Sequence, residues 1–185
     1  KVICDRYNAK NVIDPCSGWG GRMIGAVASG ARYTGIEPAT DTFAALQNIC
    51  SDLKINDSVT LHNSTAETTL PKLEKKYDLL ITSPPYFNLE IYTNEETQSY
   101  KEQQTWEEWV ENYLAPWVNW SLDLLIPGGV SCWSVKNFKS DKQYNLKDVV
   151  IELHKKKGWN IQKEIFYIGK SDGKPSEETF IFKNN

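Results

Sequence analysis

Apolar residues along this chain follow two alternating patterns. Short apolar runs, typical of buried parallel strands, are followed by stretches with apolar residues at helical spacing. This succession predicts an α/β fold, in which helices cover both faces of a mostly parallel sheet. The turn-rich residues 170–176 predict that the last two strands form an antiparallel hairpin. Seven strands are expected, at residues 11–14, 32–37, 59–62, 78–83, 130–135, 161–168 and 179–183.

Capping residues indicate where several helices begin and end. Gly30 is expected to close the first long helix, and Asp41 to cap the second. Thr105 and Glu108 match a capping box, and Pro116 predicts a kink in the helix that follows. We expect most of one face of that helix to be core, because its apolar residues recur at helical spacing: Trp106, Trp109, Val110, Tyr113, Leu114 and Trp117.

Residues 87–104 are polar and follow neither pattern. A loop of this length inside a compact domain is usually functional or mobile. It directly follows the strand expected at 78–83, at the edge of the sheet where such folds bind ligands. We therefore expect a substrate-side loop here.

Length and charge limit the classes of protein. The chain has 185 residues, which predicts a single domain spanning residues 1–185. Its net charge of −3 argues against a strongly basic, non-specific nucleic-acid binder, because phosphate affinity depends on Lys and Arg. Local basic patches remain possible at residues 136–139 and 154–157, although the second is more simply explained as a solvated helix end.

The cysteines and histidines predict neither a metal site nor a disulfide framework. Cys4, Cys16, Cys50 and Cys132 show no paired spacing, and the chain has two histidines. A reducing cytosol fits this usage best. No apolar run reaches transmembrane length and no signal peptide is visible, so no membrane association is expected. Because the chain starts at Lys1, we expect that its native N-terminal residues are missing.

A glycine-rich turn after the first strand suits a small polar ligand. Gly18 and Gly20 allow close backbone approach and positive φ, and the next helix starts there. Glu37, at the end of the second strand, is placed to accept hydrogen bonds from two ribose hydroxyls. Ser64 and Thr65, after the third strand, are candidates to border an adenine ring.

The segment Ser83, Pro84, Pro85 and Tyr86 carries the most specific chemistry. Two prolines cannot continue a central strand, so the backbone turns outward there. The turn brings together a hydroxyl, a rigid carbonyl on Pro84 and an aromatic ring. Two acceptors can hold the hydrogens of an exocyclic amino group while the ring stacks on the base.

These motifs together resemble the class I S-adenosylmethionine-dependent amino-methyltransferases of DNA. The resemblance rests on residues 14–20 (DPCSGWG), Glu37 and residues 83–86 (SPPY), and it extends over nearly the whole chain. It implies a Rossmann-like fold, with Asp14, Cys16, Gly18, Gly20 and Glu37 at the cofactor. Cys16 stands where a phenylalanine is usual.

The resemblance also implies a reaction. Residues 83–86 would hold a base flipped out of double-stranded DNA, and Ser83 at their head resembles the cytosine-N4 branch more than the adenine-N6 branch. Such enzymes act in restriction and modification, in the cytoplasm of a bacterial or phage-type host cell. The chain shows no separate recognition domain, which leaves truncation, a partner subunit or a small target.

Three other functions remain open. An enzyme of the same fold could act on RNA or on a protein amide, although Asn rather than Ser83 would be expected for the amide. A catalytically silent scaffold would bind cofactor or a partner, but the intact residues 83–86 argue against decay. A nicotinamide-dependent oxidoreductase fits the glycine turn, yet the full G-x-G-x-x-G spacing is absent.

Overall fold

A computed structural model of the chain describes residues 1–101, 104–169 and 175–184. The main sheet contains seven strands: β1 (Asn11–Asp14), β2 (Arg32–Ile36), β3 (Val59–His62), β4 (Tyr77–Thr82), β5 (Leu125–Ser134), β8 (Trp159–Gly169) and β9 (Pro175–Asn184). The α-helices are α1 (Val2–Arg6), α2 (Gly21–Val27), α3 (Thr40–Asp52), α4 (Ala66–Thr69), α5 (Trp106–Trp109), α6 (Ala115–Asp123) and α7 (Leu146–Lys156). Smaller elements are the 3-10 turns η1 (Asn56–Ser58) and η2 (Leu70–Lys72), the π-helical turn η3 (Val110–Leu114), and a separate hairpin of β6 (Phe138–Lys139) and β7 (Gln143–Tyr144).

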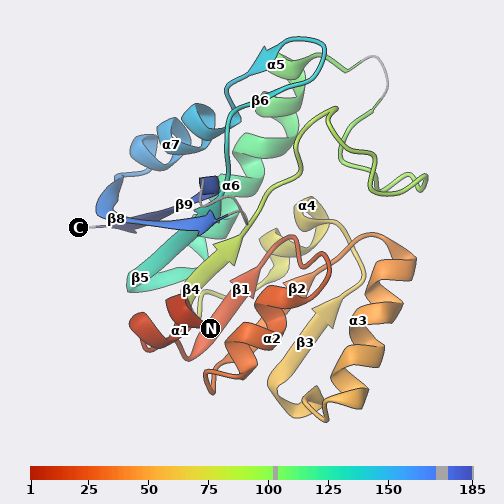
Figure 1. Cartoon of the computed structure of the whole chain (residues 1–185), viewed down its shortest axis with the longest axis vertical. Coiled ribbons are helices and arrows are strands. Elements are labelled where there is room, and N and C mark those ends of the chain that lie inside the picture. The colour runs from red at the N-terminus through yellow and green to blue at the C-terminus, as the bar shows by residue number, and fades with distance from the viewer. Residues whose placement is uncertain (102–103, 170–174, 185) are drawn as a thin grey trace.

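The strand order is β3-β2-β1-β4-β5-β9-β8. Strands β1 to β5 pair in parallel, whereas β9 runs antiparallel to both β5 and β8 (Figure 1). The order reverses between β1 and β4, because the chain first builds outward to β3 and then returns. Parallel sheets bind ligands at the carboxyl ends of the strands beside such a reversal. The predicted α/β fold and its closing hairpin are confirmed.

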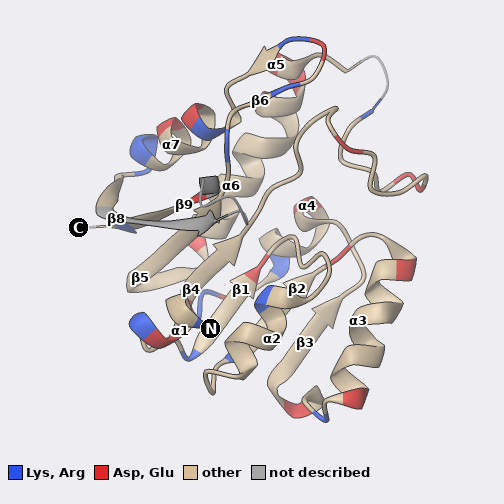
Figure 2. Ribbon diagram, in the orientation of Figure 1, with Lys and Arg blue, Asp and Glu red and all other residues tan. Residues whose placement is uncertain are grey.

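Charged residues lie mainly on the helices and loops, and the central strands carry few (Figure 2). Strand β5 contains none, and β4 contains Asp78 alone. The Asp78 carboxylate accepts hydrogen bonds from the backbone N–H groups of Lys10 and Asn11, at 3.0–3.2 Å, where β1 begins. This half-buried polar contact joins the amino ends of two neighbouring strands. In the described part of the chain, no helix is long and apolar enough to cross a membrane.

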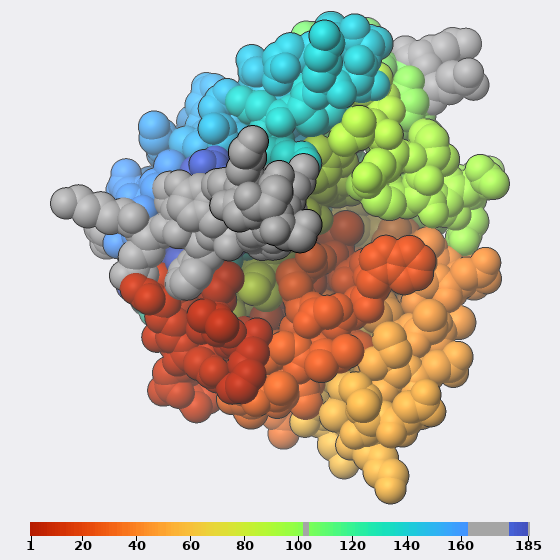
Figure 3. All heavy atoms as spheres, viewed as in Figure 1, coloured from red at the N-terminus to blue at the C-terminus, as the bar shows by residue number. Residues whose placement is uncertain are grey.

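The segment after β4 leaves the sheet and extends over its carboxyl edge. In Figure 3 a recess separates this green segment from the orange elements of the amino-terminal half. The segment is attached on its far side by Glu95, whose carboxylate accepts hydrogen bonds from Thr40 N and Thr40 Oγ1, each at 3.0 Å. The predicted loop therefore bridges β4 and the start of α3.

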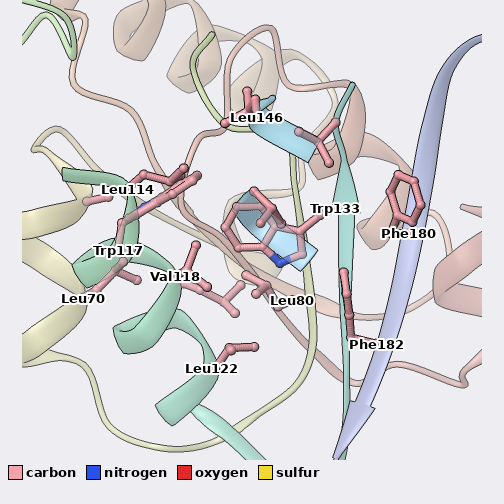
Figure 4. Packing of buried hydrophobic residues seen from close by; sticks show 14 of the residues in the cluster. Leu70, Leu80, Leu114, Trp117, Val118, Leu122, Trp133, Leu146, Phe180 and Phe182 are labelled. Carbon is pink, nitrogen blue, oxygen red and sulfur yellow. The ribbon is translucent and has the colours of Figure 1, made fainter. Parts of the chain in front are cut away.

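The core has two layers, one on each face of the sheet. Neighbouring residues in β4 point to opposite layers: Leu79 joins the cluster with α2 and α3, and Leu80 joins the cluster with α6 and α7. In the second layer, Trp117, Val118 and Leu122 of α6 point toward Leu80 and the indole of Trp133 (Figure 4). Full burial of each such side chain contributes about 1.5–3 kcal/mol. Helices therefore cover both faces, as predicted.

The tryptophan-rich helix confirms its predicted capping box and buried face. Thr105 Oγ1 accepts from Glu108 N, and the Glu108 carboxylate accepts from Thr105 N. Trp109 and Trp117 are fully buried. The predicted kink takes the form of the π-helical turn η3, which ends just before Pro116 near the start of α6. Pro116 has no backbone N–H and cannot donate to a carbonyl in the preceding turn. The extra residue of the π-helical turn accommodates this missing hydrogen bond.

Two local predictions were wrong, and one element was not predicted. Asp41 does not cap α3, because the helix already starts at Thr40, whose N–H is satisfied by Glu95. The fifth strand, expected at residues 130–135, begins earlier, at Leu125. Leu125 already pairs with Tyr77, and a register shift before Leu79 accommodates the extra residues around Gly128. The β6–β7 hairpin was not predicted, since strands of two residues are too short to show a period. The predicted turn at 170–176 falls largely outside the described residues.

Candidate functional site

A cavity of about 550 Å³ lies at the carboxyl ends of β1, β2 and β4. Its volume is within the range of small-molecule sites, roughly 300–1,000 Å³. The turn after β1, the segment after β2, residues 83–85 and the loop after them all contribute to its walls. The lining residues are Pro15, Cys16, Ser17, Gly18, Trp19, Gly21, Arg22, Glu37, Pro38, Ala39, Thr42, Thr65, Ala66, Glu67, Ser83, Pro84, Pro85, Glu90, Tyr92, Thr93, Thr97, Gln98, Ser99 and Tyr113.

Asp14 supports the glycine turn from beneath and does not line the cavity. It is fully buried. Its carboxylate accepts hydrogen bonds from Arg22 Nε at 2.7 Å, from the Tyr33 hydroxyl at 2.8 Å and from Cys16 N at 3.1 Å. Arg22 also donates to the Cys16 carbonyl. A buried carboxylate with this many donors holds the turn in one conformation.

The two glycines of the turn have different roles. Gly18 lines the cavity and has φ +53°, which favours glycine. Gly20 also has positive φ but does not line the cavity, and a Cβ there would lie 2.8 Å from Leu46 Cδ2 on α3. Gly20 is therefore required for close packing of the turn against α3. Gly18 is the one that faces the cavity.

Glu37 lies in the cavity wall and is buried. Its Oε2 accepts from Gly18 N at 2.9 Å, and its Oε1 accepts from Ala39 N at 3.0 Å. The Gly18 N–H is thus not free for a ligand, contrary to what the glycine turn alone suggested. Each carboxylate oxygen still has a second lone pair. Burial raises the pKa of Glu37, although these two backbone hydrogen bonds oppose the shift.

Ser83, Pro84 and Pro85 line the same cavity as Gly18 and Glu37. Tyr86 does not. Its ring is 7% exposed and meets the Phe138 ring edge-on at 5.3 Å, and its hydroxyl accepts from Lys136 N at 3.1 Å. The structure therefore brings the predicted serine and prolines to the same cavity as Gly18 and Glu37, while Tyr86 packs against Phe138 of the β6–β7 hairpin. Its role as a stacking ring stays a prediction.

Ser64, Thr65 and Cys16 complete the predicted set. Thr65 lines the cavity and caps α4, where its side chain accepts from Thr68 N. Ser64 does not line it. Cys16 lines the cavity, and burial raises the pKa of its thiol to about 12. The thiol therefore stays protonated at neutral pH, which gives it the character of a small apolar contact rather than a nucleophile.

The loop after β4 supplies lining residues that sequence reasoning missed. Thr97 Oγ1 and Ser99 Oγ are buried and have no hydrogen-bond partner among the described residues. Buried hydroxyls rarely stay unpaired in proteins. These two therefore fit a polar ligand in the cavity. No local motif marks them, because only the attachment of the loop at Thr40 brings them over the glycine turn.

The charge of the lining favours a cation. Three carboxylates line the cavity, on Glu37, Glu67 and Glu90. The single lining cation in the described residues is Arg22, which is paired with Asp14 at 2.7 Å. A ligand with a positive sulfonium and a flat adenine would meet complementary charge and the apolar faces of Pro38 and Ala39. The anionic diphosphate of a dinucleotide would not.

The family comparison agrees with this chemistry. A family model described as conserved hypothetical protein 95 matches residues 1–113, which is more than half of the chain. The chain belongs to this family. It is a family of S-adenosylmethionine-dependent methyltransferases. Membership of this family confirms the predicted cofactor, S-adenosylmethionine. No curated protein sequence matches the chain significantly.

Solved structures show the same fold at low sequence identity. An rRNA methylase from Streptococcus thermophilus is 12% identical, with a TM-score of 0.63 over 98% of this chain and 94% of that chain. NSun6 from Pyrococcus horikoshii, solved with SFG, is 16% identical, with a TM-score of 0.66 over 96% of this chain and 48% of that chain. A precorrin 8w decarboxylase from Methanobacterium thermoautotrophicum is 14% identical, with a TM-score of 0.65 over 100% of this chain and 88% of that chain.

Proposed function

We propose that this methyltransferase acts on the exocyclic amino group of a nucleobase in RNA. The observation that carries the proposal is the shared cavity: Ser83 and Pro84 line it together with Gly18 and Glu37. One cavity would therefore hold both the methyl donor and the accepting amino group. Methyl transfer needs the two in line, and holding them so is a large part of catalysis by positioning.

The cofactor half of the cavity fits S-adenosylmethionine through its own residues. When bound, this cofactor supplies an electrophilic methyl group on a sulfonium. Glu37 would accept hydrogen bonds from the ribose through the lone pairs that Gly18 N and Ala39 N leave free. Thr97 and Ser99 would give their unpaired hydroxyls to polar atoms of the same ligand. Arg22, neutralised by Asp14, leaves the lining net acidic.

Ser83 and Pro84 would prepare the amino nitrogen for attack. The lone pair of an exocyclic amino group is delocalised into the base, so the nitrogen is a poor nucleophile. Hydrogen bonds from the amino hydrogens to Ser83 Oγ and to the Pro84 carbonyl favour a pyramidal nitrogen and localise the lone pair. The Pro84 carbonyl is rigid, because Pro84 and Pro85 fix the backbone. Acceptors that are already in place act as preorganised electrostatic stabilisation.

The base must leave its stack to reach this cavity. Base flipping costs a few kcal/mol, and least where the base is already single-stranded. We infer that the site takes an unpaired or flipped base. RNA is placed first because neighbours with the same fold, including the Streptococcus thermophilus protein, are named rRNA methylases.

Cytosine N4 in double-stranded DNA is the second candidate substrate. The observation that favours it is Ser83 at the head of residues 83–86, which resembles the cytosine-N4 branch of the DNA enzymes. Adenine N6 in DNA is the next candidate substrate, if the site around Ser83 accommodates a purine base. In either case we propose that residues 1–185 form one catalytic domain in the cytoplasm, and that target recognition comes from a partner subunit or from a region outside this chain.

Methyl transfer to separate nucleic acids tests the function. The chain would be incubated with methyl-labelled S-adenosylmethionine and, in turn, single-stranded RNA, structured RNA and double-stranded DNA. Nucleoside mass analysis should then find methyl on an exocyclic amino nitrogen of RNA. If N4-methylcytosine appears in DNA and no methyl appears in RNA, double-stranded DNA replaces RNA as the proposed substrate. Methyl found only on a ring carbon or on protein would overturn the proposal.

A further inference from the structure

We propose that residues 136–144, here called the basic hairpin, bind the sugar–phosphate backbone of the RNA strand beside the target base. The basic hairpin contains strands β6 and β7 and carries Lys136, Lys139 and Lys142. This inference rests on the proposed function, since it names the surface that holds the substrate of the same site.

The basic hairpin is attached directly to the segment that follows Ser83. Lys136 N donates to the Tyr86 hydroxyl at 3.1 Å, and the Phe138 ring meets the Tyr86 ring at 5.3 Å. Asn88 Nδ2 donates to Asp141 Oδ1 at 2.9 Å. Because Tyr86 directly follows Pro85, these contacts place the hairpin next to the prolines that line the cavity.

The two sides of the basic hairpin differ in character. Phe138 and Tyr144 are buried and face a group of aromatic rings, with Tyr144 5.3 Å from Phe87 and 5.1 Å from Trp106. Lys139 and Gln143 pair across the two strands, and alternation along each strand places them on the opposite side. Lys136, Lys139 and Lys142 are exposed. The buried aromatic residues thus fix a hairpin whose three lysines are exposed.

The lysine charges on the basic hairpin are not neutralised within the described residues. None of the three ammonium groups forms an ion pair there, and Lys142 lies over the Tyr144 ring at 5.5 Å. The one acid of the hairpin, Asp141, accepts instead from the Tyr144 hydroxyl at 2.8 Å and from Asn88. Blue segments lie on and beside β6 in Figure 2.

Phosphate is the ligand chemistry that this surface fits. The chain as a whole has a net charge of −3, so a cluster of unpaired lysines beside the target motif is a local exception. Phosphate contacts supply most non-specific affinity and set the register of a protein on a strand, whereas base contacts carry sequence information. The basic hairpin would therefore hold the strand while Ser83 meets the base.

Salt dependence of RNA binding provides the test. A variant with Lys136→Gln, Lys139→Gln and Lys142→Gln would be compared with the parent for binding to a single-stranded RNA 20-mer of mixed sequence. The matched control changes Lys72, Lys75 and Lys76 to Gln, which removes the same charge from three exposed lysines at the opposite, amino end of β4. If each lysine of the basic hairpin meets one phosphate, the slope of log K against log salt should fall by about 2, since each single-strand contact contributes about 0.7.

The outcomes separate this inference from the proposed function. The hairpin variant should need more RNA for half-maximal methylation at an unchanged maximal rate, and the control should match the parent. Arginine at the three hairpin positions should restore the parent slope, which excludes a folding defect. A hairpin variant that binds RNA with the parent slope, while the parent methylates RNA, overturns the hairpin alone. A parent that neither binds nor methylates RNA overturns both.

Discussion

The two sides of the cavity are built by different physical means. On the cofactor side, buried charges and backbone groups hold the turn: Asp14 binds Arg22, and Glu37 binds Gly18 N and Ala39 N. On the substrate side, the segment after Ser83 is held mainly by aromatic rings. The difference shows why the cofactor side has a compact sequence motif, whereas the substrate side depends on residues far apart in the chain.

Phe87 illustrates the substrate side. It has φ +44°, in the left-handed region that bulky residues rarely adopt, at a cost of about 1–3 kcal/mol. Its ring contacts the rings of four residues at centroid distances of 4.9–5.6 Å: Tyr100, Trp106, Trp109 and Tyr144. Each aromatic pair contributes about 0.5–1.5 kcal/mol beyond burial, so the contacts together outweigh the strain.

Of the substitutions proposed here, Trp109→Ala should have the largest effect, because it removes a ring that holds the substrate side together. The indole is fully buried and donates to the Ser99 carbonyl at 3.0 Å, which also holds the loop over the cavity. Trp109→Ala should lower the free energy of unfolding by about 3–5 kcal/mol, measured by urea denaturation. Trp19→Ala is the matched control, because Trp19 is 87% exposed and should change stability little. A Trp109→Ala variant as stable as the parent would show that the aromatic group does not hold this side.

Ser83→Ala should separate chemistry from cofactor binding. It removes one of the two acceptors proposed for the amino group, and a loss of roughly 10²–10³ in rate is the scale for one such interaction. Cofactor affinity, measured by calorimetry, should stay close to that of the parent. Ser51→Ala, at an exposed position on α3, serves as the control. Equal rates for both variants would remove Ser83 from the mechanism.

Glu37→Gln should weaken the cofactor side while leaving the substrate side intact. The change removes the charge from hydrogen bonds to the ribose, which contribute about 1.5–3 kcal/mol each when one partner is ionised. Affinity for S-adenosylmethionine should therefore fall by roughly 10- to 100-fold, whereas RNA binding without cofactor should not change. Undiminished cofactor affinity would contradict the ribose assignment.

Acid should destabilise the fold through His154, which lies in α7 and packs against the rings of Trp133 and Phe182 outside both sides of the cavity. Burial lowers the pKa of His154 to about 3, and its neutral ring donates to the Val150 carbonyl and lies 3.0 Å from Ser131 Oγ. Below pH of about 6.5 the unfolded chain binds a proton that the folded chain does not. Stability from this group is complete above that pH and falls by about 1.4 kcal/mol for each unit below it. Urea denaturation at pH 7.5 and 5 should show a smaller difference in His154→Gln, and an equal difference would contradict the assignment.

Glu37 should respond to pH in the opposite direction. Because burial raises its pKa, the folded chain takes up a proton at a pH where the unfolded chain does not, so this group favours folding as the pH falls. The same proton removes the charge that a cationic cofactor needs. Affinity for S-adenosylmethionine should therefore decline as the pH falls toward the raised pKa, and calorimetry should show no such decline in Glu37→Gln.

The sequence by itself determined the sheet, most of its helices and the position of the cofactor motif. Apolar runs, capping residues and glycines with positive φ act over a few residues, so their signals are local: the capping box at Thr105, Gly18 and the strand before Ser83 were all predicted. Only the tertiary structure decided which side chains meet. Contacts between Glu95 and Thr40, between Lys136 and Tyr86, and between Trp109 and Ser99 depend on how distant segments pack. Pairs of this kind leave no periodic signal in the chain. For that reason the sequence indicated a substrate-side loop and a basic patch, but the contacts that fix the loop and the hairpin fold of residues 136–144 became visible only in the folded molecule.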